Sequence, residues 1–195
     1  MGRVGVLALQ GDFAAHGRML DRLGVAWQEV RTPRQLAKVE GLIMPGGEST
    51  TLLKLLTTSG LWEALESFHA EQHPLMGTCA GLIVLARETR QPAQASLGYI
   101  DLVAIRNAYG RQVDSFIALG ETVTGAGLGE TPLEMVFIRA PKMLDFGPEV
   151  VPLATCRDDV VLARQGTVLV ATFHPELTSD CRVHQYFLDM IAATV

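Results

Sequence analysis

The chain has 195 residues, of which 48% are hydrophobic and 19% are charged, and we expect one globular domain over residues 1–195. Its formal net charge of −5, without a basic run, argues against nucleic acid as a partner, because binding to the phosphate backbone needs clustered cations. No apolar run approaches the roughly 20 residues that span a bilayer, and the N-terminal run is too short for a signal peptide. We therefore expect a cytoplasmic protein that does not contact a membrane.

The first half of the chain alternates short apolar runs with amphipathic helical patterns. Strands are expected at residues 4–9, 25–30, 41–44 and 75–76. Helices are expected before Gly24, around Leu36, over 52–68 and over 82–86. Strands that alternate with helices indicate a parallel sheet covered on both faces.

Beyond Arg87 the pattern changes to short β-prone runs separated by Gly, Pro and Asp turns. These runs lie at 113–119, 133–138, 150–154, 160–163 and 168–173. They either extend the sheet or form an antiparallel flap. The chain closes with a helix expected over 180–193, capped by Ser179 or Asp180.

The strongest chemical signal is the pentapeptide Gly77-Thr78-Cys79-Ala80-Gly81, which lies between an expected strand and an expected helix. A G-x-C-x-G sequence in this setting is the thiol version of a nucleophile elbow, in which the nucleophile occupies a strained turn and glycines let other backbone approach closely. The N-terminus of the following helix favours a thiolate and presents the Ala80 N–H to a developing oxyanion. Taken alone, the pentapeptide fits equally well an inert cysteine in a glycine-packed turn.

A base for this thiol is expected at His174, which follows the β-prone run 168–173. Its imidazole can take the Cys79 proton, and Glu176, two residues on, can reach the other ring nitrogen and fix the tautomer. The alternative is a turn that ends a strand and carries a surface carboxylate. Solvated or structural roles are expected for the remaining histidines, His16, His69, His73 and His184. Cys156 and Cys181 are expected to be small buried hydrophobic residues, as most lone cysteines are. The spacing of the three cysteines predicts neither a disulfide framework nor a metal site.

A second glycine element, Pro45-Gly46-Gly47-Glu48-Ser49-Thr50, ends the third expected strand and opens a helix. Its backbone N–H groups are candidates for binding an anion or an oxyanion, and Ser49 is a candidate helix cap. Arg106 and Arg139 can each form a bidentate pair with a substrate carboxylate. From the residues alone, both arginines are better interpreted as surface residues.

Six segments together resemble a known family. They are LQGD at 9–12, PGGEST at 45–50, GTCAGL at 77–82, RNAYGRQ at 106–112, FIRAP at 137–141 and ATFHPELTSD with RVHQYF over 171–187. The set is similar to the glutaminase subunit of the two-subunit pyridoxal 5'-phosphate synthase, a triad-type glutamine amidotransferase. The GTCAG and HPE motifs indicate only the wider superfamily, whereas PGGEST, RNAYGRQ and HPELTSD are more specific.

The resemblance implies a three-layer, flavodoxin-like α/β fold of the class I glutamine amidotransferases, with a mostly parallel central sheet flanked by helices. It implies hydrolysis of L-glutamine to L-glutamate and ammonia by a Cys79, His174 and Glu176 triad through a thioester, without cofactor or metal. The oxyanion would be bound by the backbone N–H groups of Gly47 and Ala80. The family's other site positions match Gly47, Glu48, Ser49, Arg106, Ile138 and Arg139 for L-glutamine, and Gln10 for activation by a docked partner.

In this family the ammonia passes to a (β/α)₈-barrel synthase subunit, and many copies of both subunits form a hetero-oligomer that makes vitamin B6 as pyridoxal 5'-phosphate. One alternative is a glutaminase subunit of another synthase, such as that of imidazole glycerol phosphate. A second alternative, from a different class, is a regulatory binding module on the same fold. That reading requires a missing triad member.

Overall fold

The computed structural model describes residues 3–106 and 115–194, so residues 107–112 of the RNAYGRQ segment and residues 113–114 of an expected strand lie outside the described residues. The strands are β1 (Val4–Leu7), β2 (Trp27–Val30), β3 (Gly41–Met44), β4 (Leu75–Thr78), β5 (Ala86–Arg90), β6 (Ile100–Ile105), β7 (Ser115–Thr122), β8 (Leu133–Ile138), β9 (Lys142–Leu144), β10 (Val151–Cys156), β11 (Asp159–Gln165) and β12 (Val168–Ala171). The helices are α1 (Phe13–Arg22), α2 (Pro33–Leu36), α3 (Ser49–Thr58), α4 (Leu61–Ala70), α5 (Ala80–Leu85) and α6 (Arg182–Thr194), with a 3-10 turn, η1, at Pro175–Leu177.

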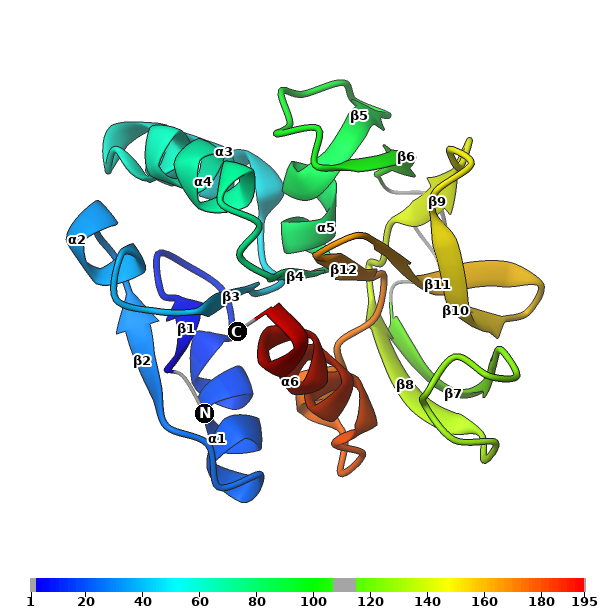
Figure 1. Cartoon of the computed structure of the whole chain (residues 1–195). Helices are drawn as coiled ribbons and strands as arrows, with labels where there is room; N and C mark the ends of the chain where they lie inside the picture. Colours follow the sequence, from blue (N-terminus) through cyan, green and yellow to red (C-terminus); the bar gives the residue numbers. More distant parts are fainter. Residues whose placement is uncertain (1–2, 107–114, 195) are drawn as a thin grey trace.

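Parallel strands form one half of the main sheet, in the order β2-β1-β3-β4-β12 (Figure 1). This is the strand order of flavodoxin-like folds. β1, β3, β4 and β12 are buried at every residue, as expected for parallel strands covered by helices on both faces. The α/β fold class expected from the sequence is therefore confirmed.

The other half of the main sheet is antiparallel and consists of β11, β10, β7 and β8. The β-prone runs of the second half of the chain thus extend the sheet rather than forming a detached flap. β12 belongs to the parallel half, because it pairs with β4. This pairing places the end of the β12 strand next to the end of β4.

A smaller sheet, in the order β5-β6-β9, was not expected from the sequence. The helix expected over 82–86 ends at Leu85, and Ala86 begins β5. The β5 segment carries Arg87, Glu88 and Arg90 and does not alternate apolar with polar residues, so its local pattern does not predict a strand. This segment forms a strand because it pairs in parallel with β6.

The helices form two layers, with α2, α3, α4 and α5 on one face of the main sheet and α1 and α6 on the other (Figure 1). Each layer has its own buried cluster, one including Leu52 and Leu65, the other including Leu20 and Phe187. The pattern over 52–68 forms two helices instead of one, because Gly60 adopts a left-handed φ of 71° between α3 and α4.

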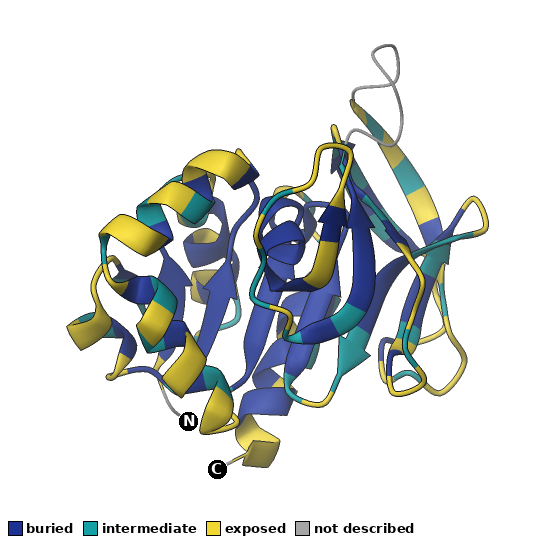
Figure 2. Ribbon diagram, turned by 90° about the horizontal axis from the view of Figure 1, so that it is seen from above, coloured by how far each residue is buried: buried dark blue, intermediate teal, exposed yellow. Residues whose placement is uncertain are grey.

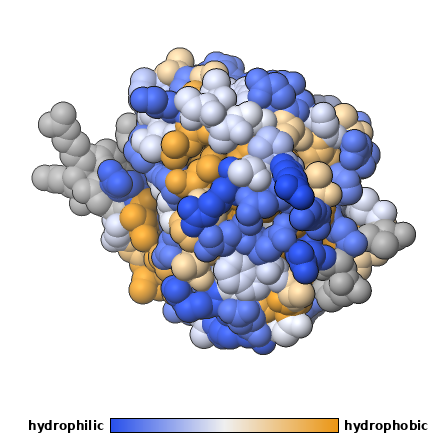
Figure 3. All heavy atoms as spheres, turned by 90° about the vertical axis from the view of Figure 1, so that its left-hand side faces the viewer, coloured by the Kyte–Doolittle hydropathy of each residue, from blue (hydrophilic) through white to orange (hydrophobic). Residues whose placement is uncertain are grey.

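Exposure follows this layering, since the strands between the layers are buried and the outer faces of the helices are exposed (Figure 2). On the side of the molecule that carries β2 and α2, hydrophilic residues cover the centre of the face and hydrophobic residues show in separate patches (Figure 3). Within the described ranges, no helix has the length and hydropathy needed to cross a bilayer.

Candidate active site

Cys79 occupies a strained turn between β4 and α5. It adopts φ 48° and ψ −100°, a region that residues other than glycine rarely enter and that costs roughly 1–3 kcal/mol. The turn is held by the Cys79 N–H, which donates to the Ala171 carbonyl at 2.9 Å. A Cβ added to Gly81 would lie 2.1 Å from the Met44 carbonyl oxygen, so β3 approaches the elbow closely enough to require glycine. The turn therefore has the geometry of the nucleophile elbow expected from the sequence.

His174 lies just beyond β12, where the pairing of β12 with β4 brings it beside the elbow. Its backbone N–H donates to the Val136 carbonyl on β8 at 2.8 Å. Its Nδ1 lies 2.7 Å from Oε1 of Glu176, which sits on η1. Both residues are 7% exposed. The carboxylate thus occupies the position of an orienting group, and the surface turn considered as an alternative does not occur.

The electrostatics of these groups depend on one another. Burial disfavours the charged imidazole, but hydrogen bonds with Cys79 and Glu176 and their charges outweigh it and raise the pKa of His174 to about 10. Burial also opposes ionisation of Glu176, yet the adjacent histidines His16 and His174 hold the pKa of this carboxyl below its usual value. This arrangement favours a protonated His174 beside an ionised Glu176.

Gly46 and Gly47 form the turn that faces Cys79. A Cβ on Gly46 would lie 2.4 Å from His174 Cε1 and 3.2 Å from Cys79 Cβ, so this turn packs directly on the thiol and its neighbour. Gly47 has a φ of 148°, which disfavours any side chain. The Gly46 carbonyl oxygen lies against Gly11, and because a trans peptide is planar, the Gly47 N–H points away from that side.

Around Cys79 and His174 there is a cavity of about 180 Å³. It is also lined by Gly47, Glu48, Ser49, Ile83, Arg106, Ile138, Arg139 and Pro141. Nearly all the residues that the resemblance assigned to glutamine or the triad therefore meet in one place. Glu176 lies behind His174, Gln10 contacts Gly47 from the β1 side, and Ala80 follows Cys79.

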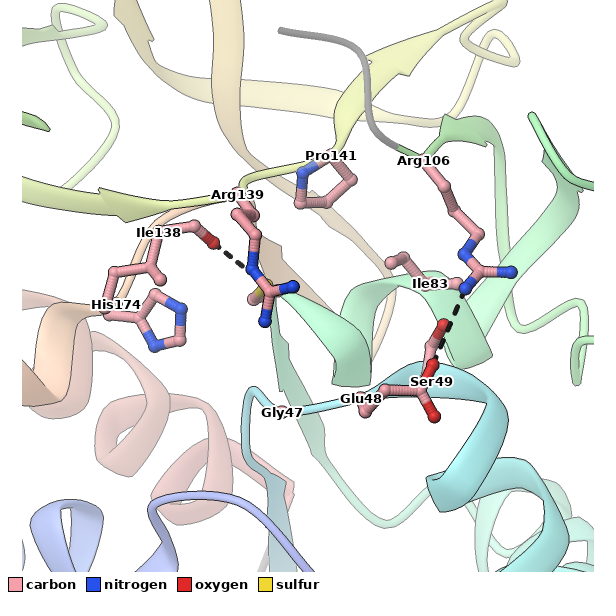
Figure 4. Close-up of a pocket in the computed structure, with 10 residues that line it drawn as sticks. Gly47, Glu48, Ser49, Ile83, Arg106, Ile138, Arg139, Pro141 and His174 are labelled. Atoms are coloured by element: carbon pink, nitrogen blue, oxygen red, sulfur yellow. Dashed lines mark hydrogen bonds and ion pairs between the residues drawn. The ribbon is translucent and has the colours of Figure 1, made fainter. Parts of the chain in front are cut away.

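The two arginines enter this cavity from different elements. Figure 4 shows Arg106 pointing toward Glu48 and Arg139 pointing from the end of β8 into the space beside His174. Arg106 Nη2 lies 3.6 Å from Glu48 Oε1. Arg139, like Cys79, is a non-glycine residue with a positive φ, 44°. Both arginines line the cavity that holds the thiol, Arg106 as a half-buried residue and Arg139 as an exposed one.

The walls near α3 are held by local hydrogen bonds. Glu48 caps α3, accepting from the backbone N–H groups of Thr50 at 3.1 Å and Thr51 at 2.6 Å. Hydrogen bonds from Thr50 and Thr51 lower the pKa of Glu48 to about 2. Glu48 rather than Ser49 is therefore the helix cap, and Ser49 Oγ donates instead to Gln94 Oε1 at 3.0 Å.

His16 and His184 are the residues near the site that sequence reasoning missed. Both are 0% exposed, and His16 Nε2 lies 3.4 Å from Glu176 Oε2. The sequence predicts a solvated or structural role for each, since neither has a carboxylate at a suggestive spacing; their burial fits the structural role, but the contact with Glu176 is not predicted. The only available signal was indirect: a histidine on the apolar face of each of two helices that flank the sheet.

Comparison with known proteins places this geometry in a family. Residues 6–193 match the model of the SNO glutamine amidotransferase family. The chain is 49% identical over 189 residues to pyridoxal 5'-phosphate synthase subunit PdxT of Thermosipho africanus, covering 97% of this chain and 98% of that protein. It is 51% identical over 192 residues to the PdxT subunit of Deinococcus radiodurans, covering 96% of each.

A solved glutamine amidotransferase structure is 46% identical and has a TM-score of 0.89, covering 97% of this chain and 98% of that chain. The fold is thus that of a glutamine amidotransferase. More narrowly, the chain belongs to the SNO glutamine amidotransferase family. The resemblance, the fold class and the enzyme class expected from the sequence are confirmed.

Proposed function

We propose that this chain is the glutaminase subunit of a pyridoxal 5'-phosphate synthase. It hydrolyses L-glutamine to L-glutamate and ammonia, and the ammonia is used by a synthase subunit to make vitamin B6. Residues 1–195 act as one glutaminase domain in the cytoplasm. The observation that carries this proposal is the arrangement of Cys79 on a strained elbow beside His174, which Glu176 holds at 2.7 Å.

The reaction proceeds in two halves. The Cys79 sulfur attacks the side-chain amide carbon of glutamine, while the proton on His174 passes to the departing nitrogen, so that ammonia leaves and a thioester forms. His174, now neutral, takes a proton from water, and the hydroxide attacks the thioester to release glutamate. Glu176 keeps the His174 ring oriented and stabilises its charged form, without reacting itself.

The oxyanion of each tetrahedral intermediate is bound by the backbone N–H groups of Ala80 and Gly47. Ala80 opens α5, so its N–H has no partner within the helix and is free to donate. Arg106 and Arg139 supply positive charge for the α-carboxylate of glutamine. Glu48, Ser49 and Ile138 complete the binding site, with Glu48 also pairing with Arg106.

The partner is a pyridoxal 5'-phosphate synthase subunit in a multi-copy hetero-oligomer. Support comes from the relatives, which are named as subunits of that synthase and align along 96% or more of this chain. These relatives also favour this partner over an imidazole glycerol phosphate synthase. The presence of every triad member removes the reason to consider a non-catalytic module.

The test uses the full chain mixed with a PdxS-type synthase subunit from a pyridoxal 5'-phosphate synthase. Glutamate formation is measured, together with synthesis of pyridoxal 5'-phosphate from a pentose phosphate and a triose phosphate. Glutamine should support synthesis with the wild-type chain and not with Cys79→Ser, whereas added ammonium should support it with both. If glutamine fails with the wild-type chain while ammonium succeeds, the proposal is wrong.

A further inference from the structure

Two buried histidines that the proposed mechanism does not use lie directly behind Glu176. His16 projects from α1 and His184 from α6, and His16 Nδ1 lies 2.9 Å from His184 Nε2. His16 Nε2 lies 3.4 Å from Glu176 Oε2. The same nitrogen lies 3.4 Å from the hydroxyl of Thr78, the residue before Cys79. His16 therefore connects the orienting carboxylate to the strand that carries the nucleophile.

The proton positions follow from what each ring nitrogen faces. Glu176 Oε2 is buried and makes no hydrogen bond of ordinary geometry to the described residues, and a carboxylate can only accept. If His16 Nε2 carries the proton, its N–H faces this oxygen favourably. If Nε2 is unprotonated, its lone pair faces the oxygen and repels it. Burial lowers the pKa of His16 and so favours a neutral ring. In a neutral ring with its proton on Nε2, Nδ1 accepts from the Nε2–H of His184, 2.9 Å away.

We propose that His16 is a positioning residue for the triad: its Nε2–H faces Glu176 Oε2 at 3.4 Å and stabilises the negative charge there, so that Glu176 Oε1 stays directed at His174 Nδ1. His184 fixes the required tautomer of His16 by donating to its Nδ1. This inference rests on the proposed glutaminase function, in which Glu176 orients His174. It extends the orienting chain by two residues that come from helices on the opposite side of the sheet from α5.

The consequence concerns the charge on Glu176. A buried carboxylate that loses one of the two N–H groups facing it is less stable as an anion, and its pKa rises. His174 then loses part of the negative charge that keeps it protonated. The other charged or titratable groups that act on His16, His184 and Glu176 are Asp12 on the first turn of α1, Arg22 at its end and His174 itself. Replacing His16 removes none of these groups.

The test compares two amide substitutions of equal polarity. In His16→Gln the side-chain amide reaches the position of Nε2 and can still donate to Glu176, whereas in His16→Asn it reaches only the position of Nδ1. Glutamine hydrolysis is measured on the complex with the synthase subunit. His16→Asn should lower kcat by on the order of ten-fold to a hundred-fold, the size of losing a hydrogen bond to a charged group, and leave KM nearly unchanged. His16→Gln should restore most of the loss.

The pH dependence separates positioning from packing. In His16→Asn the acid limb of the kcat profile should move to higher pH, because Glu176 takes up its proton more readily. Met19→Ala, which removes a buried side chain three residues further along α1, is the matched control. Met19→Ala should lower the free energy of unfolding and leave the acid limb of the kcat profile at the same pH. If His16→Asn and His16→Gln have the same kcat and the acid limb of their kcat profiles lies at the same pH, His16 serves only packing and the inference is wrong.

A second measurement does not depend on turnover. Nitrogen NMR of the histidine rings in the full chain reports the titration of His174 directly. The pKa of His174 should fall in His16→Asn and return toward the wild-type value in His16→Gln. If the wild-type complex hydrolyses no glutamine, the proposed function fails, while this titration still decides whether His16 acts on Glu176. An unchanged His174 titration in His16→Asn would overturn the positioning role.

Discussion

Gln10 lies across Gly47: its Oε1 accepts a hydrogen bond from the Glu48 N–H at 3.0 Å, and a Cβ added to Gly47 would lie 2.3 Å from the same oxygen. Gln10 follows β1, whereas Gly47 follows β3, so the contact couples two adjacent strand ends at the cavity. Because Gly47 also has a left-handed φ of 148°, both space and backbone conformation require glycine there.

Gly47→Ala should therefore lower glutamine hydrolysis by on the order of 10²–10³, the loss typical of one missing oxyanion donor. The added methyl group displaces the turn from Gln10 and tilts the Gly47 N–H. Steady-state kinetics of the complex measure the effect. Gly24→Ala is the control, since Gly24 has a φ of 68° but open space around it. Equal activities for the two variants would show that the turn does not need Gly47.

Coupling to the synthase subunit is expected at the same turn. The peptide between Gly46 and Gly47 can rotate at little cost because both residues are glycine, so docking of the partner can select the orientation that directs the Gly47 N–H to the oxyanion. The isolated chain should then be a poor glutaminase that the synthase subunit activates. Glutamate release is measured with and without saturating synthase subunit. Identical turnover in the two conditions refutes gating and leaves the triad untouched.

Cys79→Ser should abolish glutaminase activity without loss of fold or of partner binding, because the substitution removes the nucleophilic sulfur and keeps the size of the side chain. An electrophilic glutamine analogue should label Cys79 in the wild-type chain. Cys156 should be spared, since it does not line the cavity and burial raises the pKa of its thiol. Peptide mass spectrometry locates the label. Labelling of Cys156 or Cys181 to the same extent would remove the case for Cys79.

Glu176→Gln should lower kcat by roughly 10² or more and change glutamine affinity little. The amide keeps the shape of the side chain but loses the charge that stabilises a protonated His174. The pKa of His174, about 10 in the native site, should fall in this variant. Kinetics and histidine NMR measure the two effects. Turnover near that of the wild type would mean that another group holds His174.

Stability should fall as the pH drops below the ordinary histidine pKa of 6.5. Burial lowers the pKa of His184 to about 3, so between pH 6.5 and 3 the unfolded chain binds a proton at this residue that the folded chain does not. Each such proton lowers the free energy of unfolding by about 1.4 kcal/mol per pH unit. In His184→Leu the slope should be shallower by about one proton in urea titrations at successive pH values. An unchanged slope would mean that His184 is already charged in the fold.

Local sequence determined the elements that carry the site. β3 and β8 have the expected bounds, because each is a short, mostly apolar run bounded by turn residues. The elbow is also predicted by its glycines: Gly77 packs on the nearby residues Gly81 and Leu82, whereas the close approach that requires Gly81 comes from Met44 on β3. His174 and Glu176 were found because they lie two positions apart.

Tertiary structure decided which distant groups surround that elbow. The small sheet of β5, β6 and β9 depends on strand pairing that the local sequence pattern does not predict. His16 and His184 meet although 168 residues separate them, and a histidine on a helix gives no local sign of which buried group it will face. Only the packing of α1 and α6 against the same face of the sheet places His184 against His16 and His16 against Glu176. The low dielectric of the interior makes the proton positions on both rings matter there.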